Sequence, residues 1–337
     1  MKKPVGALPF AISPATGNPA LPLSFGQLLD RIYALTRANL RLFLEITTIP
    51  AVIYILCCAP LTVTWVVLVL PWQSGQHPTL TRRGDWLLAV DVVCILLIVL
   101  FFPLYEAAAC YAAVQANAGA RVTPGEAWRI TWKNAGRYLW LTILRALVGF
   151  GPMIAAGAAA EGAIVLLQMR ISRGENGDVA FILLGIVMLV YLAAGIYAVL
   201  MSVRMALVYP ASVVDNLTAW RSIVRSNRVA RGAGLRIWLA TFLMFAITYA
   251  IWLAVALVIL TFTLIGVWMI AAFHVRMEPW GYLWIGVLGL IFLLSVFFWI
   301  AFYWTAFETC ATVLYHDQLL RKEGLAPAPV RLQERPA

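Results

Sequence analysis

The chain has 337 residues, of which 63% are hydrophobic and only 12% are charged, and its formal net charge is +10 at pH 7. Soluble domains average about 45–50% apolar and about 25% charged residues, so this composition excludes a chain that buries its apolar surface in soluble cores alone. The sequence therefore predicts an integral membrane protein, in which lipid covers part of the apolar surface.

Six long apolar segments follow one another along the chain. Each exceeds the ~20 residues that a helix needs to cross the hydrocarbon layer, and each is continuously apolar rather than alternating, which excludes a β-barrel. The predicted class is an all-α membrane protein with six transmembrane helices. The segments cover residues 42–71, 86–116, 138–169, 179–209, 235–273 and 280–315.

The membrane domain is expected over residues 24–325, with a flexible cytoplasmic tail at each end, 1–23 and 326–337. Lysine and arginine are distributed unequally about the six segments. Twenty of the 25 fall on the side that carries both tails, and this excess places both termini in the cytoplasm. The other five are Arg82, Arg83, Arg170, Arg173 and Arg276.

Three amphipathic helices are predicted on the cytoplasmic side, each ahead of a pair of apolar segments. The first begins with Ser24 and Gln27 at the spacing of a capping box, and the second with Thr123 as cap and Glu126 in the first turn. The third covers residues 216–232. Their basic faces suit anionic lipid headgroups or a protein partner. The candidate surface consists of Arg129, Lys133, Arg137, Arg221, Arg225, Arg228 and Arg231.

These helices begin near residues 24, 123 and 216, at intervals of 99 and 93 residues. The simplest arrangement is three repeats of one interfacial helix and one transmembrane hairpin. The alternative is that any six-helix chain with short outer loops gives a similar spacing.

Glu106, Arg145 and Glu161 are the most deeply placed ionisable residues in the apolar segments. A charge at a helix centre costs about 2.5–3.5 kcal/mol on insertion scales, so such residues are candidates for function. Glu106 and Arg145 lie at similar depth on consecutive antiparallel helices and are expected to pair. That pair either locks the bundle or belongs to a path for an ion or headgroup. Glu161 lies among small residues, which favours packing against a polar partner.

The sequence predicts no metal or cofactor site. Of the three histidines, His77 and His274 fall in expected outer loops and His316 on the opposite side. A zinc site shared by His77 and His274 is the alternative to two solvated loops.

Three stretches in the second half of the chain carry a resemblance to a known family. They are RMALVYPASVVD at 204–215, RSNRVARG at 225–232 and YHDQLLRKEG at 315–324. Together they resemble the membrane domain named after glycerophosphoryl diester phosphodiesterases, which also occurs as free-standing bacterial membrane proteins. The matching residues are Arg204, Pro210, Asp215, Arg225, Ser226, Gly232, Tyr315, Asp317, Arg321, Glu323 and Gly324.

The resemblance implies a multi-pass protein of the bacterial cytoplasmic membrane. The family's phosphodiesterase chemistry belongs to a separate soluble barrel, so no such activity is expected here. The first hypothesis is a non-enzymatic module that scaffolds or regulates a membrane partner, forms a homo-oligomer or engages anionic lipid. The second is a transporter-like subunit with a polar path near Glu106, Arg145 and Glu161. An enzyme is the weakest reading, and no nucleic-acid-binding pattern is present.

Overall fold

The computed structural model describes residues 22–64, 82–173, 178–272 and 279–324, and every regular element in these ranges is an α-helix. Six of the helices are long and apolar enough to cross a membrane. The predicted all-α membrane class with six spans is confirmed for this part of the chain.

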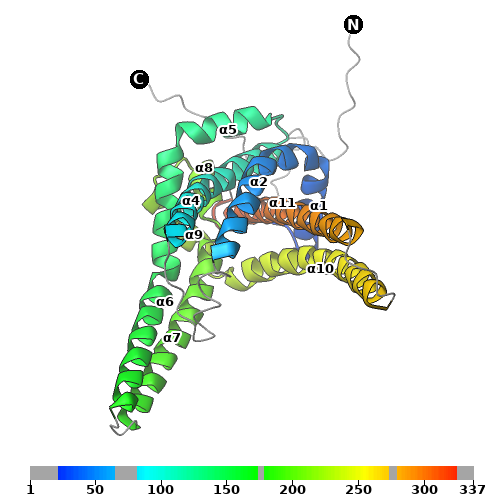
Figure 1. Ribbon diagram of the computed structural model, residues 1–337. Helices are drawn as coiled ribbons and strands as arrows, with labels where there is room; N and C mark the ends of the chain where they lie inside the picture. Colours follow the sequence, from blue (N-terminus) through cyan, green and yellow to red (C-terminus); the bar gives the residue numbers. More distant parts are fainter. Residues whose placement is uncertain (1–21, 65–81, 174–177, 273–278, 325–337) are drawn as a thin grey trace.

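The six long helices are arranged in three consecutive pairs. They are α2 (Leu40–Thr64) with α4 (Arg82–Asn117), α6 (Ala135–Ser172) with α7 (Asp178–Met205), and α10 (Gly234–Ala272) with α11 (Pro279–Glu323). The two helices of each pair pack along one another. Figure 1 shows that α6 and α7 form an arm that leaves the rest of the molecule in one direction, while α10 and α11 leave in another.

A short helix precedes each pair, in the order that three repeats require. These helices are α1 (Phe25–Ala38), α5 (Pro124–Lys133) and α9 (Ala219–Ala230). Ser24 Oγ accepts a hydrogen bond from Gln27 N at 3.3 Å and Ser24 N donates to Gln27 Oε1 at 2.9 Å, which completes the predicted capping box. Thr123 Oγ1 caps α5 by accepting from Glu126 N at 3.3 Å.

The short helices and α8 (Val208–Val214) gather around the adjoining ends of the long helices, and we call this part of the molecule the base. Residues 103–115 of α4 and 308–319 of α11 are buried without interruption, so these two helices run through the centre of the base. Five alanines in 103–115 allow neighbouring helices to approach α4 closely.

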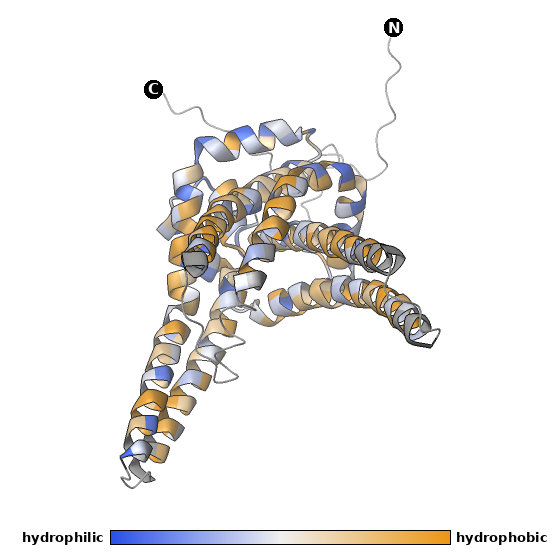
Figure 2. Cartoon of the chain, in the orientation of Figure 1, coloured by the Kyte–Doolittle hydropathy of each residue, from blue (hydrophilic) through white to orange (hydrophobic). Residues whose placement is uncertain are grey.

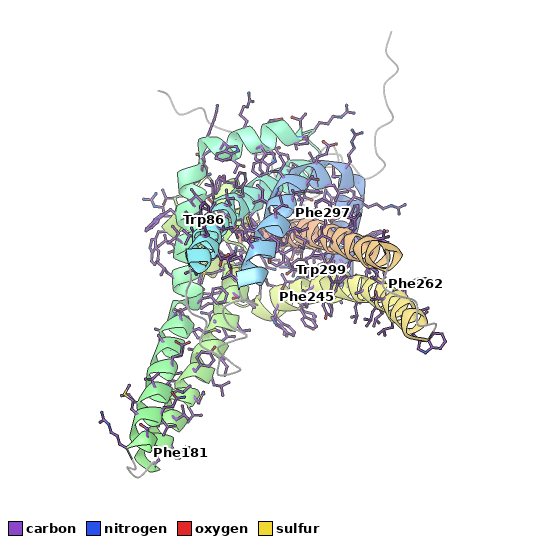
Figure 3. The ribbon with its side chains drawn as sticks, viewed as in Figure 1. Trp86, Phe181, Phe245, Phe262, Phe297 and Trp299 are labelled. Carbon is purple, nitrogen blue, oxygen red and sulfur yellow. The ribbon has the colours of Figure 1, made fainter. Side chains whose placement is uncertain are left out.

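Beyond the base, the arms expose apolar side chains in several directions. Ile154, Leu189 and Trp268 are each about two-thirds exposed, at 70%, 67% and 66%. Figure 2 shows hydrophobic residues along the length of the α6–α7 arm, and Figure 3 shows Phe181 near its end and Phe262 far along α10. Lipid is the solvent that such surfaces require.

Two helix ends differ from those predicted. The fourth segment was expected to continue to residue 209, but α7 ends at Met205 and α8 begins at Val208. Pro210 explains the break, since its ring would clash with the carbonyl of Ala206 in a continuous helix. Helix α11 continues from the predicted end at 315 to Glu323, because residues 315–319 are buried in the base.

Some predictions concern residues outside the described ranges. They include most of the N-terminal tail, the C-terminal tail from residue 325, the end of the first span after residue 64, and the histidine pair His77 and His274.

Candidate functional site

A buried ion pair joins α4 and α6 at the depth predicted. Arg145 Nη1 donates to both carboxylate oxygens of Glu106, at 3.1 and 3.3 Å. The Glu106 side chain is 6% exposed and that of Arg145 25%. Arg145 lies about 15 Å along α6 from its first residue and Glu106 about 16 Å along α4 from its last. The structure therefore brings together the two residues that sequence reasoning expected to pair.

A third ionisable residue, Glu308 of α11, reaches the same place. Glu308 is 3% exposed, and its carboxylate makes no hydrogen bond or ion pair within the described ranges. It lines, with Glu106 and Arg145, a cavity of about 330 Å³. Sequence reasoning did not place Glu308 in the site, because local spacing along the chain does not predict that α11 packs against α4.

The cavity lies where α4, α6 and α11 meet, and most of its wall is aromatic. The aromatic side chains are Phe102, Tyr105, Phe150, Tyr303, Trp304 and Phe307. Trp304 packs edge-on to Phe102 with ring centroids 5.3 Å apart, and tilted against Tyr105 at 5.2 Å. The site is thus a small, partly open aromatic pocket with three ionisable groups in its wall.

Polar contacts fix the orientation of the α6 side of the cavity. Thr142 Oγ1, one turn before Arg145, lies 2.5 Å from Tyr209 Oη of α8. The Arg145 guanidinium carbon is 5.8 Å from the centre of the Tyr209 ring. Tyr209 therefore supports Arg145 from the side away from solvent, and the break before α8 is what positions this ring.

Glu161 does not belong to this site, contrary to the prediction. It lies on α6 about 24 Å beyond Arg145 and is exposed on the arm. The small residues around it do permit a close approach, since a Cβ on Gly157 would meet Tyr191 of α7 at 3.5 Å. They bring α6 against α7 without turning Glu161 inward.

A second polar cluster lies in the base and is centred on Arg225 of α9. Arg225 Nε donates to Asp215 Oδ2 at 2.9 Å, while Nη1 and Nη2 donate to the two oxygens of Glu323 at 2.5 and 2.7 Å. Tyr315 Oη donates to the same Asp215 oxygen at 2.8 Å. The hydrogen bonds to Glu323 raise the pKa of the Arg225 guanidinium above its usual value, so this group is always charged.

Asp317 is the centre of a neighbouring cluster, and its side chain is fully buried. Its Oδ2 accepts from Arg321 Nε at 3.0 Å and lies 3.2 Å from Arg236 Nη2. Its Oδ1 accepts from the backbone N–H of Leu23 at 2.9 Å. Arg236 and Arg321 also donate to the Leu23 carbonyl. Asp317 thus ties the segment before α1 to α10 and α11.

The remaining motif residues shape the backbone of the base. Ser226 Oγ donates to the Arg204 carbonyl at 2.7 Å, which fastens α9 to the end of α7. Gly232 and Gly324 adopt positive φ values of 77° and 65°. Gly324 follows α11 directly, at a position where a glycine commonly ends a helix.

The candidate basic surface divides into two groups. Arg225 is 19% exposed and satisfied by two carboxylates, and Arg137 donates to Asn216 Oδ1 at 2.6 Å and Tyr138 Oη at 2.7 Å. These two therefore serve the fold, contrary to the prediction that they face lipid or a partner. The others are exposed: Arg129, Lys133, Arg221, Arg228 and Arg231.

Aromatic residues accompany the exposed cations. Trp132 of α5 and Trp220 of α9 are 47% and 57% exposed, and Val224 of α9 is exposed as well. The buried face of α9 instead contains small residues, including Ser222 and Ser226, together with Ile223. Trp220 and Ile223 therefore differ in burial, since Ile223 is 6% exposed and Trp220 faces outward.

Within the described ranges, no group of three or more His, Cys, Asp or Glu side chains is arranged to hold a metal ion. No family model, curated protein or solved structure matches the chain.

Proposed function

We propose that the protein is a non-enzymatic module of the bacterial cytoplasmic membrane that engages anionic lipid through its basic interfacial helices. The observation that carries the proposal is the exposed face of α9, where Trp220 and Val224 lie beside Arg221 and Arg228. An apolar and aromatic face flanked by cations is suited to the headgroup layer of an anionic leaflet. The excess of Lys and Arg supports a cytoplasmic position for the base.

The resemblance to the membrane domain of glycerophosphoryl diester phosphodiesterases supports this assignment in one respect. The residues that carry it form the Arg225 and Asp317 clusters, which join α7, α8, α9, α10 and α11. We propose that the motif maintains the base rather than performing chemistry, which leaves the exposed cations of α5 and α9 for lipid.

The experiment uses the full chain in nanodiscs that contain phosphatidylglycerol and phosphatidylcholine. Native mass spectrometry counts the phosphatidylglycerol molecules retained by the protein and by its Arg221→Gln, Arg228→Gln and double variants. Each cation near the surface contributes about 1 kcal/mol, so the double variant should bind anionic lipid about 30-fold more weakly. Arg173→Gln, an exposed arginine just after α6 on the arm, is the matched control.

Unchanged retention in the double variant contradicts the lipid proposal. A protein that co-purifies in stoichiometric amount and is lost in the double variant points instead to the alternative of a scaffold for a membrane partner.

A second candidate function is a transporter-like subunit, and the cavity between α4, α6 and α11 favours it. Polar groups at mid-span are typical of pathways for ions or headgroups. If the protein is such a subunit, Glu106→Gln abolishes the flux of the transported ion or headgroup in reconstituted vesicles, while the amount of folded protein stays the same. Loss of folded protein alone assigns the Glu106–Arg145 pair to the stability of the bundle.

A further inference from the structure

The charges around the cavity do not balance. Arg145 donates its hydrogen bonds to Glu106 and also interacts electrostatically with Glu308, so one guanidinium faces two carboxyl groups. Glu308 is 97% removed from solvent and makes no hydrogen bond or close ion pair with a described side chain. A buried carboxylate with neither a hydrogen bond nor an ion pair is costly, and the fold retains such groups where a proton or a bound ligand compensates them. The cavity thus presents two carboxyl groups and a single guanidinium, and only Glu106 is hydrogen-bonded to that guanidinium.

The walls indicate what kind of cation fits. Aromatic rings from all three helices surround the space, and Trp304 and Tyr303 are close neighbours of Glu308 along α11. Indole and phenol faces attract ammonium groups through the ring quadrupole, most strongly where water is excluded. A metal ion is usually held by several ligands, but this lining has only two carboxylates, and Glu106 is already bound to Arg145. An anion would face two carboxylates against a single guanidinium.

We propose that this cavity binds an organic ammonium group, with the Glu308 carboxylate as its counter-ion and the aromatic walls around its alkyl substituents. The Glu106–Arg145 pair forms another part of the cavity wall, and Arg145 donates its hydrogen bonds to Glu106 rather than to Glu308. The volume of about 330 Å³ lies at the lower end of the usual range for small-ligand pockets, which suits a headgroup-sized molecule. Binding here does not depend on the engagement of anionic lipid by α5 and α9.

Two sources supply this chemistry: a soluble amine, or the amine headgroup of a membrane lipid. The full chain is therefore prepared in nanodiscs of phosphatidylglycerol alone and in nanodiscs that also contain phosphatidylethanolamine. Isothermal titration calorimetry measures the binding of choline and of 3,3-dimethylbutan-1-ol, its neutral isostere. Saturable binding of choline, with binding of the neutral isostere at least about tenfold weaker, is the expected result.

The second lipid arm distinguishes the sources. If a lipid amine is the occupant, phosphatidylethanolamine lowers the apparent affinity for choline, and native mass spectrometry finds this lipid retained by the protein. If a soluble amine is the ligand, the affinity for choline is the same in both nanodiscs. Either result supports an ammonium site.

Variants tie the binding to the cavity. Glu308→Gln keeps the shape of the side chain and should weaken choline binding about tenfold or more, since a charge-assisted contact is lost. Trp304→Leu should weaken it by about threefold or more. Glu161→Gln removes a carboxylate from the exposed surface of the α6–α7 arm and should leave binding unchanged.

Three outcomes overturn the proposal: equal binding of choline and its neutral isostere, wild-type affinity in Glu308→Gln, or no saturable binding and no retained amine lipid in either nanodisc. The last outcome, at neutral and alkaline pH alike, assigns a resident proton to Glu308. Trp304→Leu supplies an independent measurement should Glu308→Gln not fold.

Discussion

Arg225 of α9 binds both carboxylate oxygens of Glu323 at the end of α11, although the two residues are 98 positions apart in the chain. The same guanidinium holds Asp215, which follows α8. One side chain thus connects the break after α7, the third short helix and the last long helix. The paired geometry is available only to arginine, because a lysine ammonium cannot donate in parallel to both oxygens.

Loss of the Arg225 side chain should therefore loosen the base. We expect Arg225→Ala to lower the free energy of unfolding by about 2 kcal/mol or more, since Asp215 and Glu323 lose their shared donor. Arg225→Lys should retain only part of the free energy of unfolding that Arg225→Ala loses. The measurement is thermal unfolding in a mild detergent, followed by intrinsic fluorescence. Arg221→Ala, an exposed arginine on the same helix, should unfold as the wild type does, and a similar loss in both variants would contradict this role.

The Glu106–Arg145 pair yields a prediction that separates stability from transport. Glu106→Gln leaves a buried guanidinium without its partner, which costs about 3–5 kcal/mol in comparable sites. The double variant Glu106→Gln with Arg145→Gln removes both charges and should recover much of that loss. The amount of folded protein and the unfolding temperature measure the effect. Additive losses in the double variant would show that the two residues act independently.

Sequence and structure agree best where the decisive information is local. The caps at Ser24 and Thr123 follow from residues three positions apart, and the depth of Glu106 and Arg145 follows from counting along two consecutive helices. Glu308 was missed as a site residue because it lies on α11, some 200 residues after Glu106. The periodicity of the sequence does not predict that these two helices pack together. The same holds for Arg225: its basic character predicts an exposed position, but Glu323, which binds it, lies 98 residues further along the chain.

Glu161 illustrates the opposite error. Small residues around a carboxylate predict close helix packing, and the packing is present at Gly157. Which side of α6 faces α7 is decided by the rotation of the helix, and the sequence around Glu161 is apolar on every side. The direction in which the Glu161 side chain points is therefore set by tertiary contacts, which cannot be predicted from the local sequence.

The buried Asp317 carboxylate should control the order of the segment before α1. Asp317→Asn keeps the size of the side chain but removes the charge that Arg236 and Arg321 share, and weakens the acceptor for Leu23 N. We expect the Leu23 amide to exchange its hydrogen at least about tenfold faster, while the amides of residues 105–114 in α4 are unaffected. Hydrogen exchange read by mass spectrometry measures both regions. Equal acceleration in both would indicate global loosening instead.

Among the described residues, Gly119, Gly232 and Gly324 adopt a left-handed backbone, and a helical glycine gives the control for one of them. Gly232 has φ of 77°, a conformation that costs an L side chain about 1–2 kcal/mol, and no atom lies within 4 Å of a Cβ placed there. Gly136, near the start of α6, has equally open space but helical backbone. We expect Gly232→Ala to lower the unfolding temperature and Gly136→Ala to leave it unchanged or raise it, since alanine favours a helix by up to about 1 kcal/mol. Because neither substitution creates a clash, the difference between the two reports the backbone strain at Gly232 together with the gain in helix propensity at Gly136. A Gly232→Ala variant as stable as the wild type would show that the turn after α9 tolerates alanine.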